Sequence, residues 1–485
     1  MAQILRDYQL ETNEEKLPYA IRKGHKKVCL YGPCGSGKTT IIADLARRCA
    51  SKDSTMTVTA HRRRLIKQLS MRLQEFGVRY TVEMADLPEE KWAVVDNGAN
   101  IVIGSKDTML ASLKKGLRPR STRVWIPDEA HTIDNDAYQS LGEAIAPEWT
   151  IGPTATPCKS DGSGFGPRLF TTIVSVTSIE KLIEQQHLVR IDCYAPVGVN
   201  RRRREGLKSG ILGDPVRQWI DHAQGLRTIT FCRTLAECRA VLQMYRADMI
   251  PAEHVDAKTP DEERDAAIGR LTTGETKVLV CTPGLMGVGV DIPEIECVQT
   301  LVRQINPRAF WQNCGRAQRT ATEKHRAVLI DHAGAVFYHG LPNWSPAWTL
   351  ATDDSVQLRQ QDRMSKTDDL RPVICNRCGT ITTGTRCPKC DTVLSSKPGI
   401  RTATDRGVVE AVNGRAPEDM RDDDWHKFLY MACAKGWKCI VPASMFKKKW
   451  GVWPDKAGVS PPFGFWMKDR LAAVEYPDYV RTPHS

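Results

Sequence analysis

The sequence has no apolar run that approaches the length needed to span a bilayer, and its polar first residues lack the pattern of a signal peptide. It also lacks the cysteine pattern of a disulfide-bonded secreted domain, because most of its 16 cysteines stand singly within apolar segments. These absences argue against a membrane-spanning or secreted protein. They predict a reduced, cytoplasmic compartment.

The chain is long and carries an excess of positive charge. Its 485 residues are too many for one ordinary core and suggest about three domains. The composition, 41% hydrophobic and 26% charged, is typical of a soluble globular protein. The formal net charge of +12 points to a polyanionic partner, with a merely soluble basic protein as the alternative.

Residues 32–39 fit the pattern G-x-x-x-x-G-K-[ST] in full. Residues 27–31 before it are typical of a buried strand, and residues 40–48 after it have helical spacing. A strand, a glycine-rich loop and a helix N-terminus together form a phosphate cradle of backbone N–H groups. Lys38 would reach the β- and γ-phosphates and Thr39 would hold Mg²⁺; the alternative is a turn that binds nothing. The candidate phosphate-binding residues are Gly32, Gly35, Ser36, Gly37, Lys38, Thr39 and Thr40.

Two adjacent carboxylates, Asp128 and Glu129, follow a predicted strand at residues 123–127 that is apolar after its first residue. This arrangement suits magnesium-assisted hydrolysis of a phosphoanhydride, with Asp128 holding the hydrated metal and Glu129 polarising the attacking water. An acidic loop after a strand is the alternative, which the upstream P-loop makes less favoured. Pro127 lacks the N–H that a central strand donates, so it marks the end of the strand.

Strands and helices alternate along roughly the first 340 residues, which predicts parallel α/β domains. A first domain ends near residue 187, after a loop at residues 160–166 that is rich in glycine and serine. A polar linker is expected at residues 342–372. The expected strands of the two domains are residues 55–60, 99–105, 123–127, 149–157, 190–196, 227–232 and 276–282.

Two short segments carry candidate ligand-binding side chains. Gln9 could pair with the donor and acceptor of an adenine, although a lone glutamine is more often a surface residue. His61 and Arg62 stand at a strand-to-helix junction, where cations and helix N–H groups could meet a phosphate backbone. A solvated basic helix is the alternative for the second segment.

Two segments of the second domain carry similar signals. Gly289 and Asp291 belong to a glycine-rich turn that lets the backbone come close to a ligand. Arg316 and Arg319 are three residues apart on a predicted helix, so they share one helical face. That face could present two guanidinium groups to one phosphate, and a plain surface pair is the alternative.

Cys375, Cys378, Cys387 and Cys390 form two C-x-x-C knuckles joined by a short loop. Two such knuckles place four thiolates around one tetrahedral Zn²⁺, as in a zinc ribbon, which we expect at residues 373–396. A redox pair or a chance pairing is the alternative. Because few apolar residues lie between the cysteines, we expect the metal to fold the segment.

A separate C-terminal domain is expected at residues 405–480. It carries Trp425, Trp437 and Trp450 near the lysines of residues 447–449, and this mixture could stack on bases and neutralise phosphates. A small helical domain with the tryptophans in its core is the more favoured interpretation. Docking on a partner protein also fits.

Taken together, these segments resemble the superfamily 2 helicases and nucleic-acid translocases, in the order that the family shows. Residues 5–9 resemble the adenine-reading motif, residues 32–39 motif I, and residues 60–62 the first nucleic-acid contact motif. Further along the chain, the resemblance covers motif II at 128–131, motif III at 154–156, motif IV at 231–234, motif V at 282–291 and motif VI at 312–319.

The resemblance implies an α/β fold of two RecA-like P-loop domains in tandem, with ATP bound in the cleft between them, followed by the zinc ribbon and the small C-terminal domain. Arg316 and Arg319 would act as arginine fingers, Gln312 and His131 would link nucleotide state to the domain interface, and Thr154 and Thr156 would transmit closure. The further residues that it implies are Gln9, Gly289 and Asp291 for the nucleotide, and His61, Arg62, Ser105, Arg233, Thr234 and Thr282 for nucleic acid.

The zinc ribbon and the C-terminal domain add a closer resemblance, to RadD-type bacterial DNA-repair helicases and their phage relatives. It implies an ATP-dependent helicase or translocase on DNA repair, recombination or replication intermediates in a bacterial or phage-infected cell. An RNA helicase and an ATP-switched nucleic-acid clamp are the alternatives. A replication or repair protein could dock on the ribbon or the C-terminal domain.

Overall fold

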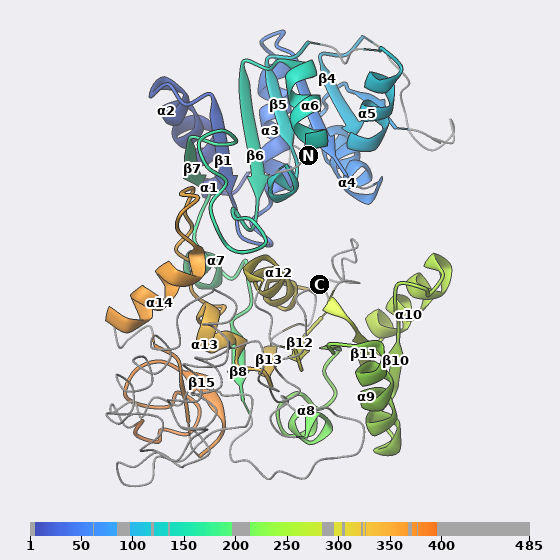
Figure 1. Cartoon of the computed structure of the whole chain (residues 1–485), viewed down its shortest axis with the longest axis vertical. Helices are drawn as coiled ribbons and strands as arrows, with labels where there is room; N and C mark the ends of the chain where they lie inside the picture. The colour runs from blue at the N-terminus through green and yellow to red at the C-terminus, as the bar shows by residue number, and fades with distance from the viewer. Residues whose placement is uncertain are drawn as a thin grey trace, which may run out of the picture. The chain divides into compact units, whose positions relative to one another are not determined.

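A computed structural model provides the fold (Figure 1). The chain divides into two units, residues 1–396 with 403–407, and residues 397–402 with 408–485. The predicted domain at residues 405–480 lies outside the described residues. The described residues are 5–61, 63–84, 98–117, 121–133, 136–195, 214–283, 295–302, 306–321, 324, 326–366, 371–375 and 377–394.

Among the described residues, the first domain contains a parallel sheet of seven strands in the order β3-β4-β2-β5-β6-β1-β7. The strands are β1 (Lys27–Tyr31), β2 (Met56–Ala60), β3 (Thr81–Glu83), β4 (Ile101–Ser105), β5 (Val124–Pro127), β6 (Trp149–Thr154) and β7 (Thr172–Ser175). The helices are α1 (Asp7–Glu11), the π-helix η1 (Thr12–Lys16), α2 (Leu17–Arg22), α3 (Lys38–Ala50), α4 (Arg63–Glu75), α5 (Lys106–Lys114), the 3₁₀ turn η2 (Ala130–Thr132), α6 (Asp136–Ile145) and α7 (Ile179–Glu184).

The second domain contains a sheet with the order β10-β11-β9-β12-β13-β8-β15-β14 in the described part of the chain. Its first six strands are parallel, and β15 and β14 run antiparallel at one edge. The strands are β8 (Ile191–Tyr194), β9 (Thr228–Phe231), β10 (Ala252–His254), β11 (Val278–Cys281), β12 (Cys297–Thr300), β13 (Ala327–Asp331), β14 (Val373–Ile374) and β15 (Thr380–Thr382). The helices are α8 (Pro215–Ala223), α9 (Leu235–Ala247), α10 (Asp261–Thr273), α12 (Pro307–Ala317) and α13 (Ala335–His339).

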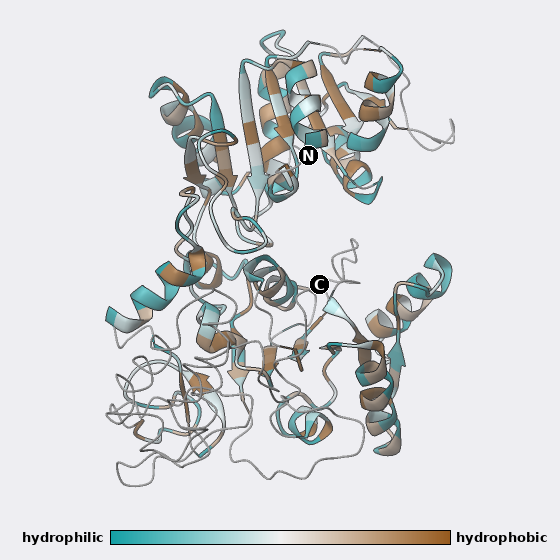
Figure 2. Cartoon of the chain, in the orientation of Figure 1, coloured by the Kyte–Doolittle hydropathy of each residue, from teal (hydrophilic) through white to brown (hydrophobic). Residues whose placement is uncertain are grey.

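The pattern of burial explains why these segments form parallel strands. Every residue of β2 and β13 is buried, as expected when helices cover both faces of a sheet. Figure 2 shows apolar strands in both sheets and helices with polar outer faces. Side chains cap several helices, since Asp214, Thr234 and Asn306 accept backbone N–H bonds at the starts of α8, α9 and α12. The α/β order predicted from the sequence is therefore confirmed. No described helix is long and apolar enough to cross a bilayer.

The cysteine-rich segment is attached to the second sheet. Its strand β15 pairs with β8, with Thr380 opposite Tyr194 and Ile381 opposite Cys193. The Lys389 ammonium group lies 4.6 Å from the centre of the Tyr194 ring. The sequence predicted a separate zinc ribbon at residues 373–396. It gave no sign of the pairing between β15 and β8, because β15 is only three residues long and its partner strand lies far away in the sequence.

The segment expected as a polar linker is folded over much of its length. It contains α14 (Val356–Lys366), and the residues before this helix lie along the first domain. Gly164 N donates to Ala351 O at 2.9 Å, and Gly166 N donates to Leu350 O at 2.8 Å. The polar composition of the segment concealed its few large apolar side chains, which pack against the domain cores. We call residues 341–366 the strap.

Candidate active site

The P-loop has the geometry of an anion cradle. β1 lies between β6 and β7, and Gly32 N donates to Thr154 O at 3.0 Å. Gly37 is the N-cap of α3 and has φ +76°, a left-handed conformation that favours glycine. The N-terminus of α3 therefore opens onto the loop. In this structure Lys38 Nζ donates to Gly32 O at 3.1 Å, so the lysine side chain lies along the P-loop, where it is predicted to bind phosphate.

Helix α1 lies directly against the P-loop. Gln9 Nε2 and the Tyr8 hydroxyl both donate to Ser36 O at 3.1 Å. The other side of the Gln9 amide, Oε1, accepts a bond from Arg6 N at 3.0 Å. Gln9 thus contacts the predicted phosphate-binding loop, and its pairing with adenine stays a prediction. Sequence reasoning did not identify Tyr8 as a contact of the P-loop, because only the neighbouring Gln9 had a recognisable role.

The two carboxylates lie at the carboxyl end of β5. Asp128 N donates to Thr59 O at 2.8 Å, and Glu129 N donates to Asp128 Oδ1 at 2.9 Å. Glu129 has φ +52°, an uncommon conformation for a residue with a side chain, and such strain is concentrated at functional sites. His131 Nδ1 lies 3.2 Å from Glu129 Oε2 and 3.2 Å from Thr154 Oγ1. His131 therefore contacts both motif II and motif III, and its role in linking nucleotide state to the domain interface stays a prediction.

The pKa values of the two carboxyl groups are shifted in opposite directions. Burial, and next the adjacent charge of Glu129, raise the pKa of Asp128 to about 7. Burial alone would raise the pKa of Glu129 as well, but the nearby His131 and Lys38 outweigh it and lower that pKa to about 2. A divalent cation would relieve the repulsion between these two adjacent carboxylates. The donor set thus fits Mg²⁺, which Thr39 and Asp128 would hold and which would neutralise charge on the phosphates.

Helix α12 contacts the first domain along one face, at positions spaced by about one turn. Arg308 Nη1 donates to His131 O at 2.9 Å, and Gln312 Nε2 lies 3.5 Å from Thr156 Oγ1. At Gly315 a Cβ atom would lie 2.6 Å from Cys34 Cβ, so glycine permits the close approach to the P-loop. One helix face thus meets motifs II, III and I. Sequence reasoning did not identify Arg308 as a contact of the first domain. Its position one helical turn before Gln312 could have placed it on the same helix face.

The two predicted arginine fingers do not share a helical face. Arg316 lies in α12, but the helix ends at Ala317, so Arg319 follows its end. Arg319 instead pairs with Leu188 as an isolated antiparallel bridge, and Val189 N donates to Gln318 O at 2.7 Å. This pairing with the interdomain segment ends the helix. A Cβ at Gly35 would lie 3.9 Å from Arg319 Cγ, so Arg319 still lies beside the P-loop.

Arg316 is half-buried, and its guanidinium interacts electrostatically with groups of the first domain. Burial lowers the pKa of its guanidinium, and the charges of Cys34 and Glu129 oppose this shift. The arginine thus lies within electrostatic reach of the P-loop cysteine and of the predicted water-polarising carboxylate. Its predicted role as a finger rests on this placement.

The predicted nucleic-acid contacts lie at the carboxyl ends of neighbouring strands. His61 and Ser105 stand at the adjacent strands β2 and β4, and Thr282 follows β11 next to β9. Thr234 also caps α9, and Arg233 Nη2 lies 2.6 Å from Glu237 Oε1, so both have local structural partners. Three further predicted site residues lie outside the described part of the chain: Arg62, Gly289 and Asp291.

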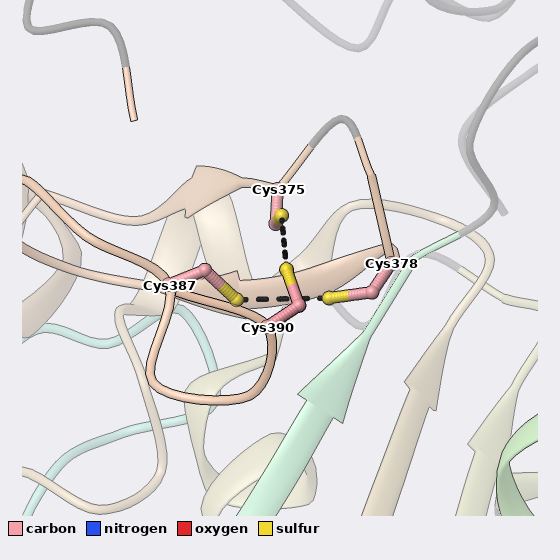
Figure 3. Close-up of side chains that lie close together, drawn as sticks. All are labelled: Cys375, Cys378, Cys387 and Cys390. Carbon is pink, nitrogen blue, oxygen red and sulfur yellow. Dashed lines mark hydrogen bonds between the residues drawn. The ribbon is translucent and has the colours of Figure 1, made fainter. Parts of the chain in front are cut away.

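The four cysteines of the ribbon meet at one point (Figure 3). Their sulfur atoms all lie within 4.8 Å of one another. Cys375 Sγ lies 3.5 Å from Cys390 Sγ, and Cys378 Sγ lies 3.6 Å from Cys387 Sγ. A tetrahedral zinc with Zn–S bonds of about 2.3 Å separates its sulfurs by about 3.8 Å. The sulfur positions therefore fit a structural zinc.

The two knuckles have the same backbone geometry. Cys375 N donates to Thr380 O, and Cys387 N donates to Thr392 O, each at 2.9 Å. The residue after each second cysteine has a positive φ, +73° at Gly379 and +54° at Asp391. The repeated turn presents each pair of thiols to the same point, which a chance grouping of cysteines would not require.

Comparisons with known proteins agree with this geometry. Residues 3–159 match the family described as type III restriction enzyme, res subunit, and residues 213–321 match the helicase conserved C-terminal domain. The chain belongs to the superfamily 2 helicases, and it is a nucleic-acid-dependent ATPase with two tandem RecA-like domains.

Two relatives extend over most of the chain. A 51.5 kDa protein of a Lactococcus phage is 25% identical over 374 residues, which are 72% of this chain and 77% of the relative. The Saccharomyces cerevisiae protein IRC3, named for an ATP-dependent helicase, is 24% identical over 373 residues. That alignment covers 69% of this chain and 52% of the yeast protein, so the chain matches about half of the latter's length.

Two solved structures share the fold. One is the type ISP restriction-modification enzyme LlaBIII bound to DNA, at 14% identity and a TM-score of 0.50, covering 68% of this chain and 28% of that one. The other is a fragment of an HsdR subunit of a type I restriction enzyme from Vibrio vulnificus, at 17% identity and a TM-score of 0.50. It covers 69% of this chain and 65% of that fragment.

Proposed function

We propose that this helicase moves along DNA and remodels branched or single-stranded intermediates of repair, recombination or replication. The observation that carries the proposal is the match to a restriction-enzyme family over residues 3–159, which contain the P-loop and both carboxylates. The net charge of +12 also suits a nucleic acid. The RadD-type relationship, a bacterial or phage-infected cytoplasm, and a repair or replication partner at the ribbon or at residues 405–480 are parts of the same proposal.

The chain's own residues suggest how closure would drive movement. Lys38 and the N-terminus of α3 would bind the phosphates, and Glu129 would orient the water. Arg316 would complete the site from the second domain, so hydrolysis would require the two domains to close. Opening and closing would shift the strand ends near His61 and Thr282 along a phosphate backbone.

The choice between DNA and RNA is tested by comparing ATPase stimulation with substrates of matched sequence. We expect single-stranded or forked DNA to raise kcat more than the same RNA does, and added salt to weaken this stimulation. Blunt duplex DNA is the comparison for structure preference. Equal or greater stimulation by RNA would assign an RNA helicase, which the splicing helicase relative at 29% identity over 119 residues represents.

We also propose that Cys375, Cys378, Cys387 and Cys390 bind one structural zinc ion. The sulfur distances and the two identical knuckles support this assignment. The hydroxyl of Thr392 lies 3.2 Å from Cys390 Sγ and lowers the pKa of that thiol to about 6, whereas burial raises the pKa of Cys387 to about 11. The hydrogen bond therefore favours the thiolate that zinc requires at Cys390. Because β15 extends the second sheet, the ion would stabilise the edge of that domain.

Replacing Cys375 with serine is expected to remove zinc and to lower the melting temperature of the purified protein. The full-length wild type should contain about one zinc per chain by elemental analysis, and strong chelators should lower its melting temperature in the same way. Cys49→Ser, in the P-loop helix α3, is the matched control and should keep its zinc. The assignment would be contradicted if the purified wild type were folded without zinc and if chelators left its melting temperature unchanged.

A further inference from the structure

We propose that the strap, residues 341–366, is a positioning element of the ATP site. It would hold the P-loop strand β1, the loop that follows motif III and helix α12 in register, so that nucleic-acid-stimulated hydrolysis depends on it. Four sets of contacts support this role, and they involve both domains.

The first contact explains the glycine-rich loop at residues 160–166. A Cβ at Gly164 would lie 2.5 Å from Leu350 Cα, and a Cβ at Gly162 would collide with the Gln357 side chain. The bonds from Gly164 N and Gly166 N to the strap, and the bridge between Ser163 and Ser355, join the two backbones. The loop thus lacks side chains at the positions that the strap occupies.

The second contact is made by Ser345. Its hydroxyl donates to Glu180 Oε2 at 2.7 Å, and its backbone N donates to Glu180 Oε1 at 2.9 Å. The same hydroxyl oxygen accepts from Ile179 N at 2.8 Å, at the start of α7. Arg363 Nη1, from α14, donates to Ser345 O at 3.1 Å. The strap is therefore bonded to α7, the last helix before the covalent connection near residue 188.

The third contact lies next to the P-loop. The Trp348 ring packs edge-on against Tyr31, with 5.8 Å between ring centres. Tyr31 is the last residue of β1 and directly precedes Gly32. Trp348 also lines the pocket where Cys34 of the P-loop meets Gly315 of α12. The strap thus packs at the junction between the two halves of the site.

The fourth contact connects the strap to α12. Helix α13, which ends two residues before the strap, packs on α12 through His339, which stacks on Phe310 with 4.7 Å between ring centres. Within the strap, Pro342 O accepts a hydrogen bond from Nε2 of Gln318, the residue that directly follows α12, at 3.2 Å. Gly340 has φ +87°, and a Cβ there would lie 2.6 Å from Gln360 Nε2 of α14. The strap is thus packed at one end on the helix that carries Arg316 and at the other on the first domain.

These contacts explain why a remote segment would affect the reaction rate. The catalytic groups come from two domains, and a misplacement of about 1 Å can cost about a hundredfold in rate. The strap adds a second packed connection between those domains, beside the covalent one near residue 188. It would fix where α12 meets the P-loop without contacting the nucleotide itself.

Gly164→Ala tests this role in the full-length protein, because the three atoms nearest to the added methyl group all belong to the backbone of Leu350 in the strap. We expect the nucleic-acid-stimulated kcat to fall by about tenfold, while the Kd for ATP and the basal ATPase rate stay within about twofold. Gly269→Ala in α10 is the matched control, since a Cβ there meets nothing within 4 Å, and it should keep the wild-type rate. A wild-type stimulated rate in Gly164→Ala would overturn the proposal.

A second experiment guards against simple misfolding of the loop. Ser345→Ala and Glu180→Gln should each lower the stimulated kcat at an unchanged melting temperature, and the double variant should lose no more than the stronger single variant. Basal and stimulated rates that fall in equal proportion, together with a lower melting temperature, would show a purely structural role and refute the proposal. Strictly additive losses would also refute it.

Discussion

Replacing Glu129 with glutamine is expected to lower the ATPase kcat by about a thousandfold while ATP still binds. Glu129 follows β5 and has a left-handed backbone conformation. The pKa of its carboxyl group is lowered to about 2, so the group is ionised at neutral pH. Glutamine has the same shape but cannot accept a proton from the attacking water, and such general-base contributions are about 10²- to 10⁴-fold. Steady-state hydrolysis and fluorescent-nucleotide binding measure the two effects separately.

Glu148→Gln is the matched control for this variant. Glu148 is in the same domain and pairs with Arg123 at 2.9 Å on the surface, away from motif II, so its loss should leave kcat unchanged. Undiminished turnover in Glu129→Gln would remove Glu129 from the reaction. Single-turnover hydrolysis by the wild type would exclude the alternative of a clamp that binds ATP without cleaving it.

Arg316→Ala is expected to lower the stimulated kcat by about 10³-fold or more, in the range found for arginine fingers. Arg316 lies in α12 of the second domain, and Gly315 beside it allows this helix to approach Cys34 of the P-loop closely. Arg316→Lys should restore little of the rate, since an ammonium cannot present the same planar pair of donors to a phosphoryl group. Rapid-quench measurement of ATP cleavage tests the chemical step itself.

Arg217→Ala, on the exposed face of α8 beside Asp221, is the control for the loss of a positive charge in the same domain. It should retain the wild-type rate and the wild-type affinity for ATP. If Arg316→Ala hydrolysed ATP at the wild-type rate, Arg319, which also lies beside the P-loop, would become the candidate finger. If Arg316→Ala lost ATP binding as well as hydrolysis, Arg316 would instead contribute to the binding of ATP before the reaction.

Much of the fold was predictable because its signals are local. A buried parallel strand such as β11, Val278–Cys281, is a continuous apolar run. The P-loop pattern is likewise local, because it is recognised between a strand and a helix. Asp128 and Glu129 were predictable for the same reason, since each is recognised within a few residues of its strand. The end of α12 was not, because its pairing partner Leu188 is more than a hundred residues away.

The residues that sequence reasoning missed are those defined by a distant partner. Tyr8 gains its role from Ser36, and Arg308 from the backbone of His131. A hydrogen bond to a backbone carbonyl leaves no pattern in the sequence of the acceptor, so neither residue was recognisable as a part of the site. The strap was mistaken for a linker for a related reason, because the core residues against which Trp344, Trp348 and Leu350 pack lie far away in the sequence.

The sequence by itself determined the chemistry of this protein: a phosphate cradle, a pair of carboxylates, arginines in a second domain and four paired thiols. These depend on residue type and short spacing, which backbone geometry converts directly into local structure. Only the tertiary structure decided how the parts are joined, with α12 facing three motifs, β15 extending the second sheet and the strap returning to the first domain. The physical reason is that such joints depend on shape complementarity between surfaces far apart in the chain, and no local pattern encodes it.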